Sequence, residues 1–299
     1  MKIAVIYGGD STEREISIKS KNAICQALKE LDQDYQPIEL TKNIAADLQN
    51  GQIDLVFNAC HGSYGEDGRL SALLDILQIP YTHSAAKACQ LAMDKFLAKN
   101  LATQLNIKTA PAYLVKDLKD FANLPADFAL EPFVLKPVAQ GSSVGVQIIQ
   151  DPLNFMIMAE HFDYGPLLVE RYLKAQEVHV AIVDNKAIGA VEIIPEQEFY
   201  DYDAKYNSKT TRYIIPPEIS KKLQDKALKA AEQLHNYLGC NYISRVDFLC
   251  QNDELYFLEI NTHPGFTKTS LVPKVAAAQN ISFNQIIAGL IAAARYEAN

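Results

Sequence analysis

Two polar pairs near the C-terminal end hold the residue types best suited to chemistry. Arg245 and Asp247 stand two positions apart in an apolar run, and Glu259 and Asn261 follow with the same spacing. Residues two apart in a β-strand point to one face, so an antiparallel hairpin turning at 251–254 gathers two carboxylates and an amide oxygen. Such an oxygen-only ligand set suits Mg²⁺, which completes its shell from water and phosphates. A solvated amphipathic hairpin is the alternative.

A lysine at the end of an apolar run forms a second candidate site. Lys136 precedes Pro137, which disfavours helix at Lys136 and places it at a strand end. The loop at 140–145 reads Gln-Gly-Ser-Ser-Val-Gly. An ammonium group and the backbone N–H groups of such a loop can hold a phosphate. A plain turn between two strands is the alternative, because the loop does not match the G-x-x-x-x-G-K-[ST] pattern.

Two acidic loops near the N-terminus add a histidine and a glutamate. His61 follows a buried apolar run and opens a glycine-punctuated loop that leads through Glu66 and Asp67 into a helix. Acids are favourable at a helix N-terminus, so capping is the expected role of both acids. His61 is a ligand candidate, with a structural hydrogen bond as the alternative. Glu13 also precedes a helix, and the sequence alone favours capping over binding of a substrate ammonium.

A polar, tyrosine-rich segment without glycine connects Pro195 to Pro216. A connection of this length in a compact chain is more often a functional lid than an ordinary turn. Lys205 and Tyr206 within it can exclude water and reach a transferring phosphoryl group. An exposed loop without function is the alternative.

The elements around these residues begin as strand, helix, strand. Apolar runs at 3–7 and 53–57 predict buried parallel strands, with a helix after Ser11 and a strand at 36–40 between them. This order predicts an open α/β unit whose ligand edge carries His61. Further strands are predicted at 112–115, 133–136, 144–149, 167–170, 178–183, 244–250 and 255–260, and further helices at 70–77, 94–106, 218–237 and twice after Ser270.

Composition excludes several classes of protein. With 28 basic and 36 acidic residues, the net charge of −8 argues against coating of nucleic acid or anionic membrane. The chain shows no signal-peptide core, no apolar run near the roughly 18 residues that span a membrane, and no metal spacing among its five cysteines. It also lacks the G-x-S-x-G and G-x-G-x-x-G motifs. The sequence predicts a cytoplasmic protein. His83, His161, His179, His235 and His263 receive no role.

The motifs, taken together, resemble those of the D-alanine–D-alanine ligases, members of the ATP-grasp superfamily. They run nearly end to end and stand in the family's order. The matching motifs are Gly8-Gly9-x-Ser11-x-Glu13-Arg14-Glu15-x-Ser17, His61-Gly-x-x-Gly-Glu-Asp-Gly68, Pro80-Tyr-Thr82, Met93-Asp-Lys95, Lys136-Pro137 with Gly141-Ser-Ser-Val-Gly145, Phe199-Tyr-Asp-Tyr-x-Ala-Lys-Tyr206, Arg245-x-Asp247, Glu259-x-Asn261-Thr-x-Pro-Gly265 and Ser270-Leu-Val-Pro273.

The resemblance implies a mixed α/β ATP-grasp fold. It implies an open parallel α/β domain resembling the biotin carboxylase N-terminal domain at 1–92, a central ATP-grasp subdomain at 93–178, and a C-terminal subdomain with lid and metal site at 179–299. In the implied reaction ATP converts one D-alanine carboxylate to an acyl phosphate. The amine of a second D-alanine then attacks, giving D-alanyl-D-alanine, ADP and phosphate. The dipeptide feeds peptidoglycan synthesis and thus cell-wall biogenesis and cell shape, and family members are commonly homodimers.

The family's nucleotide-binding and metal-binding roles fall on residues present in this sequence. By resemblance, Lys95 and Lys136 hold ATP phosphates beside Ser142, Glu170 and the chain after it bind adenine, and Glu177 binds ribose. Two Mg²⁺ or Mn²⁺ ions are implied at Asp247, Glu259 and Asn261.

The substrate roles carry over in the same way. By resemblance, Glu13 takes the ammonium of the first D-alanine in a hydrogen-bonded set with Ser142 and Tyr206, against the capping role that the sequence alone favours. The remaining implied roles are Lys205 at the γ-phosphate, Arg245 and the Gly265 amide at the oxyanion, Ser270 and the Leu271 amide at the second carboxylate, and His61 beside the substrates.

The sequence departs from the family at a few positions, and other functions stay open. Gln140 replaces an acid, His83 a glycine, Ser71-Ala72 a Gln-Gly pair and Phe266 a methionine. The Lys205-Tyr206 pair favours dipeptide formation over a D-alanine–D-lactate product. The alternatives are an ATP-grasp ligase with another second substrate, such as D-serine, and a non-catalytic nucleotide or amino-acid sensor.

Overall fold

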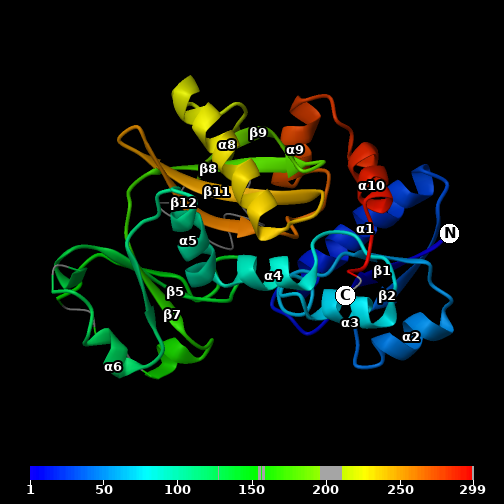
Figure 1. The fold of residues 1–299 in the computed structure, drawn as a ribbon, viewed down its shortest axis with the longest axis horizontal. Coiled ribbons are helices and arrows are strands. Elements are labelled where there is room, and N and C mark those ends of the chain that lie inside the picture. Colours follow the sequence, from blue (N-terminus) through cyan, green and yellow to red (C-terminus); the bar gives the residue numbers. More distant parts are fainter. Residues whose placement is uncertain (127, 154–155, 157–158, 196–210, 298–299) are drawn as a thin grey trace.

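A computed structural model describes residues 1–299 of the chain except 127, 154–155, 157–158, 196–210 and 298–299. In the described part, the strands form a parallel sheet of three strands and antiparallel sheets of four and five strands. The parallel sheet lies beside the N-terminus, and the antiparallel sheets extend toward the other end of the molecule (Figure 1). This arrangement confirms the predicted mixed α/β class.

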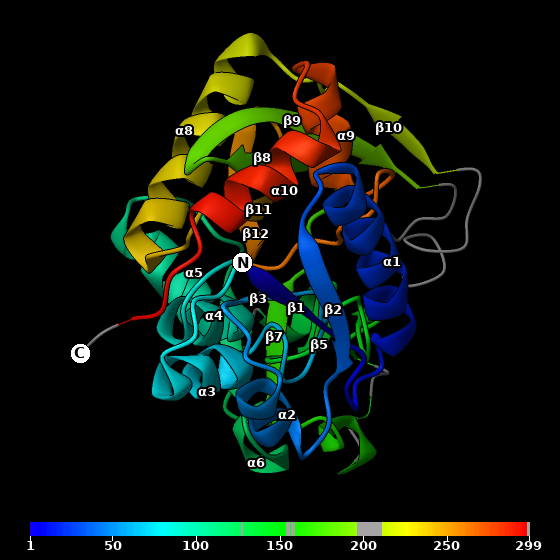
Figure 2. The same ribbon diagram turned by 90° about the vertical axis from the view of Figure 1, so that its right-hand side faces the viewer.

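Helices cover both faces of the parallel sheet, whose strand order is β2-β1-β3 (Figure 2). Its elements are β1 (Lys2–Tyr7), α1 (Arg14–Glu30), β2 (Asp34–Glu39), α2 (Ile44–Asn50), β3 (Leu55–Asn58) and α3 (Arg69–Leu77). In β1, Ile3 and Val5 pack with residues of α1, while Ala4 and Ile6 pack with residues of α2 and α3. Both faces of β1 are therefore apolar, as expected of a central parallel strand. The open α/β unit is confirmed.

The antiparallel sheet of four strands follows in the order β4-β7-β5-β6. Its elements, with the helices that precede and flank it, are α4 (Ala86–Met93), α5 (Lys95–Gln104), β4 (Ala112–Val115), α6 (Leu118–Phe121), β5 (Phe133–Pro137), β6 (Gln147–Ile149) and β7 (Leu167–Arg171). Strand β6 begins at Gln147 rather than at 144, because the chain first turns with positive φ at Ser142, Ser143 and Gly145. Helix α4 was not predicted.

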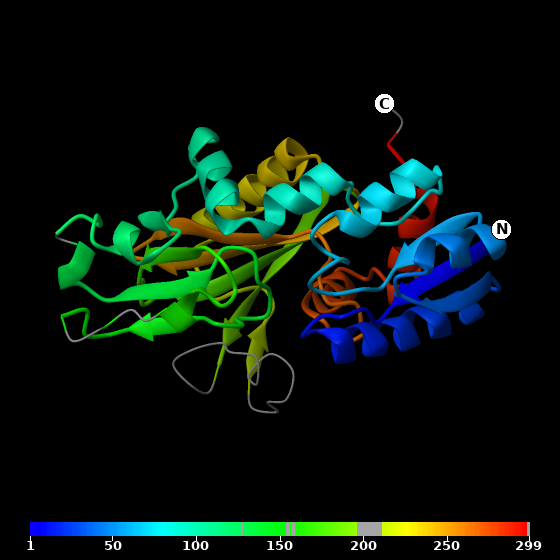
Figure 3. The same cartoon turned by 90° about the horizontal axis from the view of Figure 1, so that it is seen from below.

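The sheet of five strands has the order β10-β9-β8-β11-β12. Its elements and helices are β8 (Gln176–Val183), β9 (Lys186–Ile194), β10 (Arg212–Ile214), α8 (Lys221–Leu238), β11 (Ile243–Gln251), β12 (Glu254–Asn261), α9 (Leu271–Ala278) and α10 (Phe283–Ala292). The two antiparallel sheets lie one over the other when the molecule is seen from below (Figure 3). The predicted domain boundary after residue 178 falls inside β8, which pairs along its length with β9 and β11.

The hairpin β11–β12 forms as predicted, but its register shifts by one residue between Asp247 and Phe248. Asp247 lies opposite Glu259, and Arg245 lies opposite Asn261. All four side chains therefore share one face of the sheet. Strand β8 was predicted at 178–183, but its partner β9 was missed, although the connection between them carries a signal. Asp184 and Asn185 both adopt left-handed φ, the backbone of the tight turns that join paired strands.

Among the described helices, none is both long and apolar enough to cross a membrane alone, while α9 and α10 taken together pass by length and composition across a 109° bend.

Candidate active site

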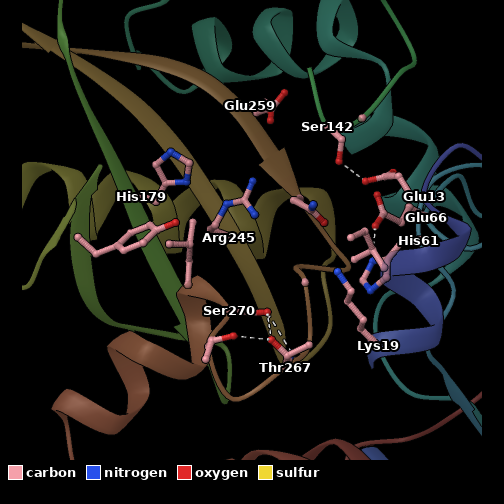
Figure 4. A pocket seen from close by; sticks show the side chains of 17 residues that line it. Glu13, Lys19, His61, Glu66, Ser142, His179, Arg245, Glu259, Thr267 and Ser270 are labelled. Carbon is pink, nitrogen blue, oxygen red and sulfur yellow. Dashed lines mark hydrogen bonds and ion pairs between the residues drawn. The ribbon is translucent and has the colours of Figure 1, made fainter. Parts of the chain in front are cut away.

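Two cavities meet beside β12. The larger, of about 490 Å³, is lined by both antiparallel sheets and includes Lys136, Glu170 and Glu177. The smaller, of about 380 Å³, lies between the loops of the parallel sheet and the start of α9 (Figure 4). Ser142 and Glu259 line both cavities. A group bound in one cavity can therefore reach a group bound in the other.

The larger cavity combines apolar walls with cations. Lys95 Nζ donates to the Gln140 carbonyl at 2.6 Å and lies 3.7 Å from Glu259 Oε2. Lys136 forms an ion pair with the Glu170 carboxylate, and both side chains are buried. Side chains such as Val134 and Leu258 supply apolar lining. A slot with apolar walls and ammonium groups suits a flat base that carries phosphates.

The predicted metal ligands lie together, and each of them already has a partner. Asp247 is held by Arg245 through Nε at 2.8 Å and Nη2 at 2.7 Å. His179 adds a contact from Nδ1 at 2.9 Å, while its Nε2 lies 2.7 Å from Glu177. Burial raises the pKa of Asp247, but the charges of Arg245 and His179 outweigh it and hold that pKa well below its usual range. The all-oxygen donor set fits Mg²⁺ or Mn²⁺.

Glu13 does not cap its helix, so the capping interpretation is wrong. It occupies the N-cap position of α1, but its side chain accepts no hydrogen bond from the backbone of that helix. Instead its carboxylate accepts a hydrogen bond from the Ser142 hydroxyl and faces the smaller cavity (Figure 4). Glu13 is only 5% exposed. A buried carboxylate aimed into a cavity is a natural partner for a substrate ammonium.

His61 and Glu66 form a buried pair in the same cavity, so capping by Glu66 is also wrong. His61 Nδ1 lies 2.9 Å from Glu66 Oε1, and Nε2 lies 2.8 Å from the Ser20 hydroxyl. Burial raises the pKa of Glu66 to about 7, and the charge of Glu13 acts in the same direction. The pKa of His61 is raised as well, because its hydrogen bond and ion pair with Glu66 outweigh burial. The acid that does accept backbone hydrogen bonds at this helix start is Asp67.

The raised pKa of Glu66 predicts a pH-dependent stability that Glu66→Gln removes. Between about pH 4.5 and 7 the folded chain retains a proton that the unfolded chain has lost, so the free energy of unfolding falls as pH rises. Across this window, the free energy of unfolding of the wild-type chain should fall by about 1–3 kcal/mol relative to that of Glu66→Gln. Urea unfolding at steps between pH 4.5 and 7.5 measures the difference. A difference that does not change with pH would contradict this environment for Glu66.

The remaining predicted substrate residues lie around the same cavity. Arg245, Gly265, Ser270 and Leu271 line it together with Glu13. The Ser270 hydroxyl accepts a hydrogen bond from the Thr267 amide at 3.0 Å, and Leu271 begins helix α9. Backbone N–H groups at a helix start favour a carboxylate. The predicted lid residues Lys205 and Tyr206 lie outside the described residues.

Two of the family departures meet behind the cavity. The His83 ring stacks on His263 with ring centroids 3.9 Å apart and contacts Phe266 edge-on at 5.9 Å. His83 and Phe266 are both buried, and burial lowers the pKa of His83 to about 3. The His83 imidazole is therefore neutral near pH 7 and packs as part of an aromatic cluster. Phe266 contacts three rings, those of Phe57, His83 and Phe283, and does not line either cavity.

Sequence reasoning missed three buried partners of the site: Glu66, His179 and Lys99. His179 follows Glu177 at strand spacing, which places both on one face. Lys99 follows Lys95 by four residues on α5, which places both on one helical face. Both spacings were available as signals. The residues that these side chains contact on other elements could not be predicted from spacing.

A larger cavity lined by two antiparallel sheets, joined to a smaller cavity beside a parallel α/β unit, is the arrangement of an ATP-grasp ligase. The D-ala D-ala ligase N-terminus model matches residues 43–84, and the D-ala D-ala ligase C-terminus model matches residues 107–292. The chain belongs to the D-alanine–D-alanine ligase family.

Individual relatives support this assignment over the whole length. The chain is 43% identical over 297 residues to a D-alanine–D-alanine ligase of Geotalea uraniireducens, covering 98% of this chain and 95% of the relative. The crystal structure of D-alanine–D-alanine ligase from Bacillus anthracis superposes with a TM-score of 0.86 at 32% identity, covering 98% and 97% of the two chains. The VanG D-Ala:D-Ser ligase of Enterococcus faecalis superposes with a TM-score of 0.81 at 27% identity, covering 97% and 98%.

Proposed function

We propose that this enzyme joins two D-alanines to D-alanyl-D-alanine with cleavage of ATP to ADP and phosphate. One observation supports this most strongly. A cation-lined cavity suited to a nucleotide adjoins a cavity suited to two amino acids, and Ser142 and Glu259 belong to both. A phosphate at the inner end of the nucleotide cavity would adjoin a carboxylate in the other. The product would serve peptidoglycan synthesis.

Two groups of residues would bind the nucleotide and the metal ions. Lys95 and Lys136 would hold phosphates, with adenine along Glu170 and the chain after it and ribose at Glu177. Asp247, Glu259 and Asn261 would hold two Mg²⁺ or Mn²⁺ ions, which when bound supply positive charge to the phosphates.

On the substrate side, Glu13 would bind the first ammonium while Arg245 and the Gly265 amide stabilise the oxyanion. Ser270 and the Leu271 amide would hold the second carboxylate, with His61 beside the substrates. Lys205 and Tyr206 complete the proposed set from the lid. We also propose a cytoplasmic homodimer, on the family resemblance.

An acceptor panel tests the proposal. The purified chain with Mg-ATP should release phosphate with D-alanine at least about a hundredfold faster than with L-alanine, because the two enantiomers cannot place ammonium, carboxylate and methyl group on the same protein contacts. Mixtures of D-alanine with D-serine or D-lactate show which second substrate is used. Faster turnover with D-serine would move the assignment toward the D-Ala:D-Ser ligases. ATP binding without turnover on any acceptor would favour the alternative of a non-catalytic nucleotide or amino-acid sensor.

A further inference from the structure

Three charged side chains are buried together beside the larger cavity. Lys99, Lys136 and Glu170 are 3%, 5% and 3% exposed. Glu170 Oε1 forms an ion pair with Lys99, and Oε2 forms one with Lys136. Lys99 Nζ also donates to the Phe257 carbonyl at 3.2 Å. Two ammonium groups thus share one carboxylate.

Only two of the three face the cavity. Lys136 and Glu170 line it, whereas Lys99 does not. Lys99 comes from the middle of α5, which lies at the junction of the antiparallel sheets (Figure 1). It reaches Glu170 on one sheet and Phe257 on the other. It therefore contacts Glu170 behind the wall that a nucleotide would touch.

The charge balance decides what Lys136 can do. A buried carboxylate left without a cation costs about 3–5 kcal/mol, so Lys136 cannot leave Glu170 for a phosphate unless another cation stays. Lys99 is that cation. Burial lowers the pKa of Lys99, and Glu170 opposes the shift. Burial would raise the pKa of Glu170, but the two lysines outweigh it and lower that pKa.

We propose that Lys99 is a positioning residue for nucleotide binding, which neutralises Glu170 and thereby frees Lys136 to hold a phosphate. The inference rests on the proposed nucleotide function of the larger cavity. It assigns to Lys99 a role in phosphate affinity although its side chain does not line the cavity.

The proposal predicts a selective loss of phosphate affinity in Lys99→Gln. The amide keeps a hydrogen-bond donor at this place, but it carries no charge, so Lys136 stays bound to Glu170. Isothermal titration of the full chain with Mg-ADP and with adenosine gives two dissociation constants. Their ratio, adenosine over ADP, should fall at least about tenfold from wild type. Lys108→Gln, at an exposed lysine paired with Glu254, is the matched control and should leave the ratio unchanged.

A double variant separates charge from packing. In Lys99→Gln with Glu170→Gln no carboxylate holds Lys136. Any lost contact of Glu170 with adenine weakens adenosine and ADP alike, so the ratio, though not each constant, should return to within about threefold of wild type. A purely structural role for Lys99 would weaken both ligands equally in the single variant. That result, or an unchanged ratio, would overturn the proposal.

Wild type binding ADP no more tightly than adenosine would overturn the proposal together with the nucleotide function. These titrations contain no D-alanine, so they measure nucleotide binding alone. A failure of ligase turnover would be seen only in the phosphate-release assay and would leave this result unchanged.

Discussion

Replacing Glu13 with glutamine is expected to lower D-alanine-dependent phosphate release by about a thousandfold. The carboxylate is buried, faces the smaller cavity and accepts the Ser142 hydrogen bond. Glutamine preserves the volume and an acceptor oxygen for Ser142, but it removes the negative charge that would pair with a substrate ammonium. An unpaired buried ammonium costs about 3–5 kcal/mol, which corresponds to between two and four powers of ten. Initial rates at a range of D-alanine concentrations measure the loss.

Glu15→Gln is the matched control for this experiment. Glu15 lies on the same helical turn with its side chain 74% exposed and 3.9 Å from Arg14, so its loss should change the rate less than twofold. Mg-ADP affinity should be unchanged in both variants, because neither residue lines the larger cavity. A Glu13→Gln rate within about fivefold of the control would rule out ammonium binding by Glu13.

The second large effect is expected at Arg245, where replacement by methionine should damage both turnover and stability. Its guanidinium makes two hydrogen bonds to the buried Asp247 carboxylate and lines the smaller cavity. Loss of an oxyanion donor typically costs about 10²–10³ in turnover. Loss of the cation should also lower the free energy of unfolding by about 3 kcal/mol, the low end for a broken buried pair, because His179 stays beside Asp247.

The chain offers a matched control pair with the same spacing. Arg69 also bonds an aspartate two residues away, Asp67, but the Arg69 side chain is 55% exposed. Arg69→Met should cost at most about 1 kcal/mol and leave turnover unchanged. Arg245→Lys should recover part of the stability, since it keeps the charge, and little of the turnover, since it loses the planar fork. Equal unfolding losses in the two methionine variants would contradict the buried ion pair.

Where the alternation of apolar and polar residues is strong, it was enough to predict the strands that carry the site residues. The alternation around Asp247 and Glu259 predicts the hairpin and the shared face, and the structure confirms both. The register shift between Asp247 and Phe248, which sets Asp247 opposite Glu259, was not predicted. The apolar run that ends before His61 predicts the parallel strand and its ligand edge. These features depend only on spacing along a strand, which a sequence contains in full.

The predictions that were wrong, and the contacts that were missed, involve side chains whose partners lie far away in the sequence. Helix propensity suggests that Glu13 and Glu66 cap helices, but their carboxylates instead find Ser142 and His61. Capping gains about 1 kcal/mol, less than the cost of leaving those buried partners unsatisfied. Lys99 and Glu170 are likewise joined only by the packing of α5 on the sheet. The roles of the individual site residues and the domain boundaries stay predictions.

The central claim is that phosphoryl transfer to a carboxylate precedes dipeptide formation. D-alanine labelled with ¹⁸O at both carboxylate oxygens tests it directly. When the amine attacks the acyl phosphate, the C–O bond breaks and one carboxylate oxygen leaves with the phosphate. We predict one ¹⁸O in each released phosphate and one D-alanyl-D-alanine per ADP, both measured by mass spectrometry. Unlabelled phosphate, or ADP formed without dipeptide, would contradict the account.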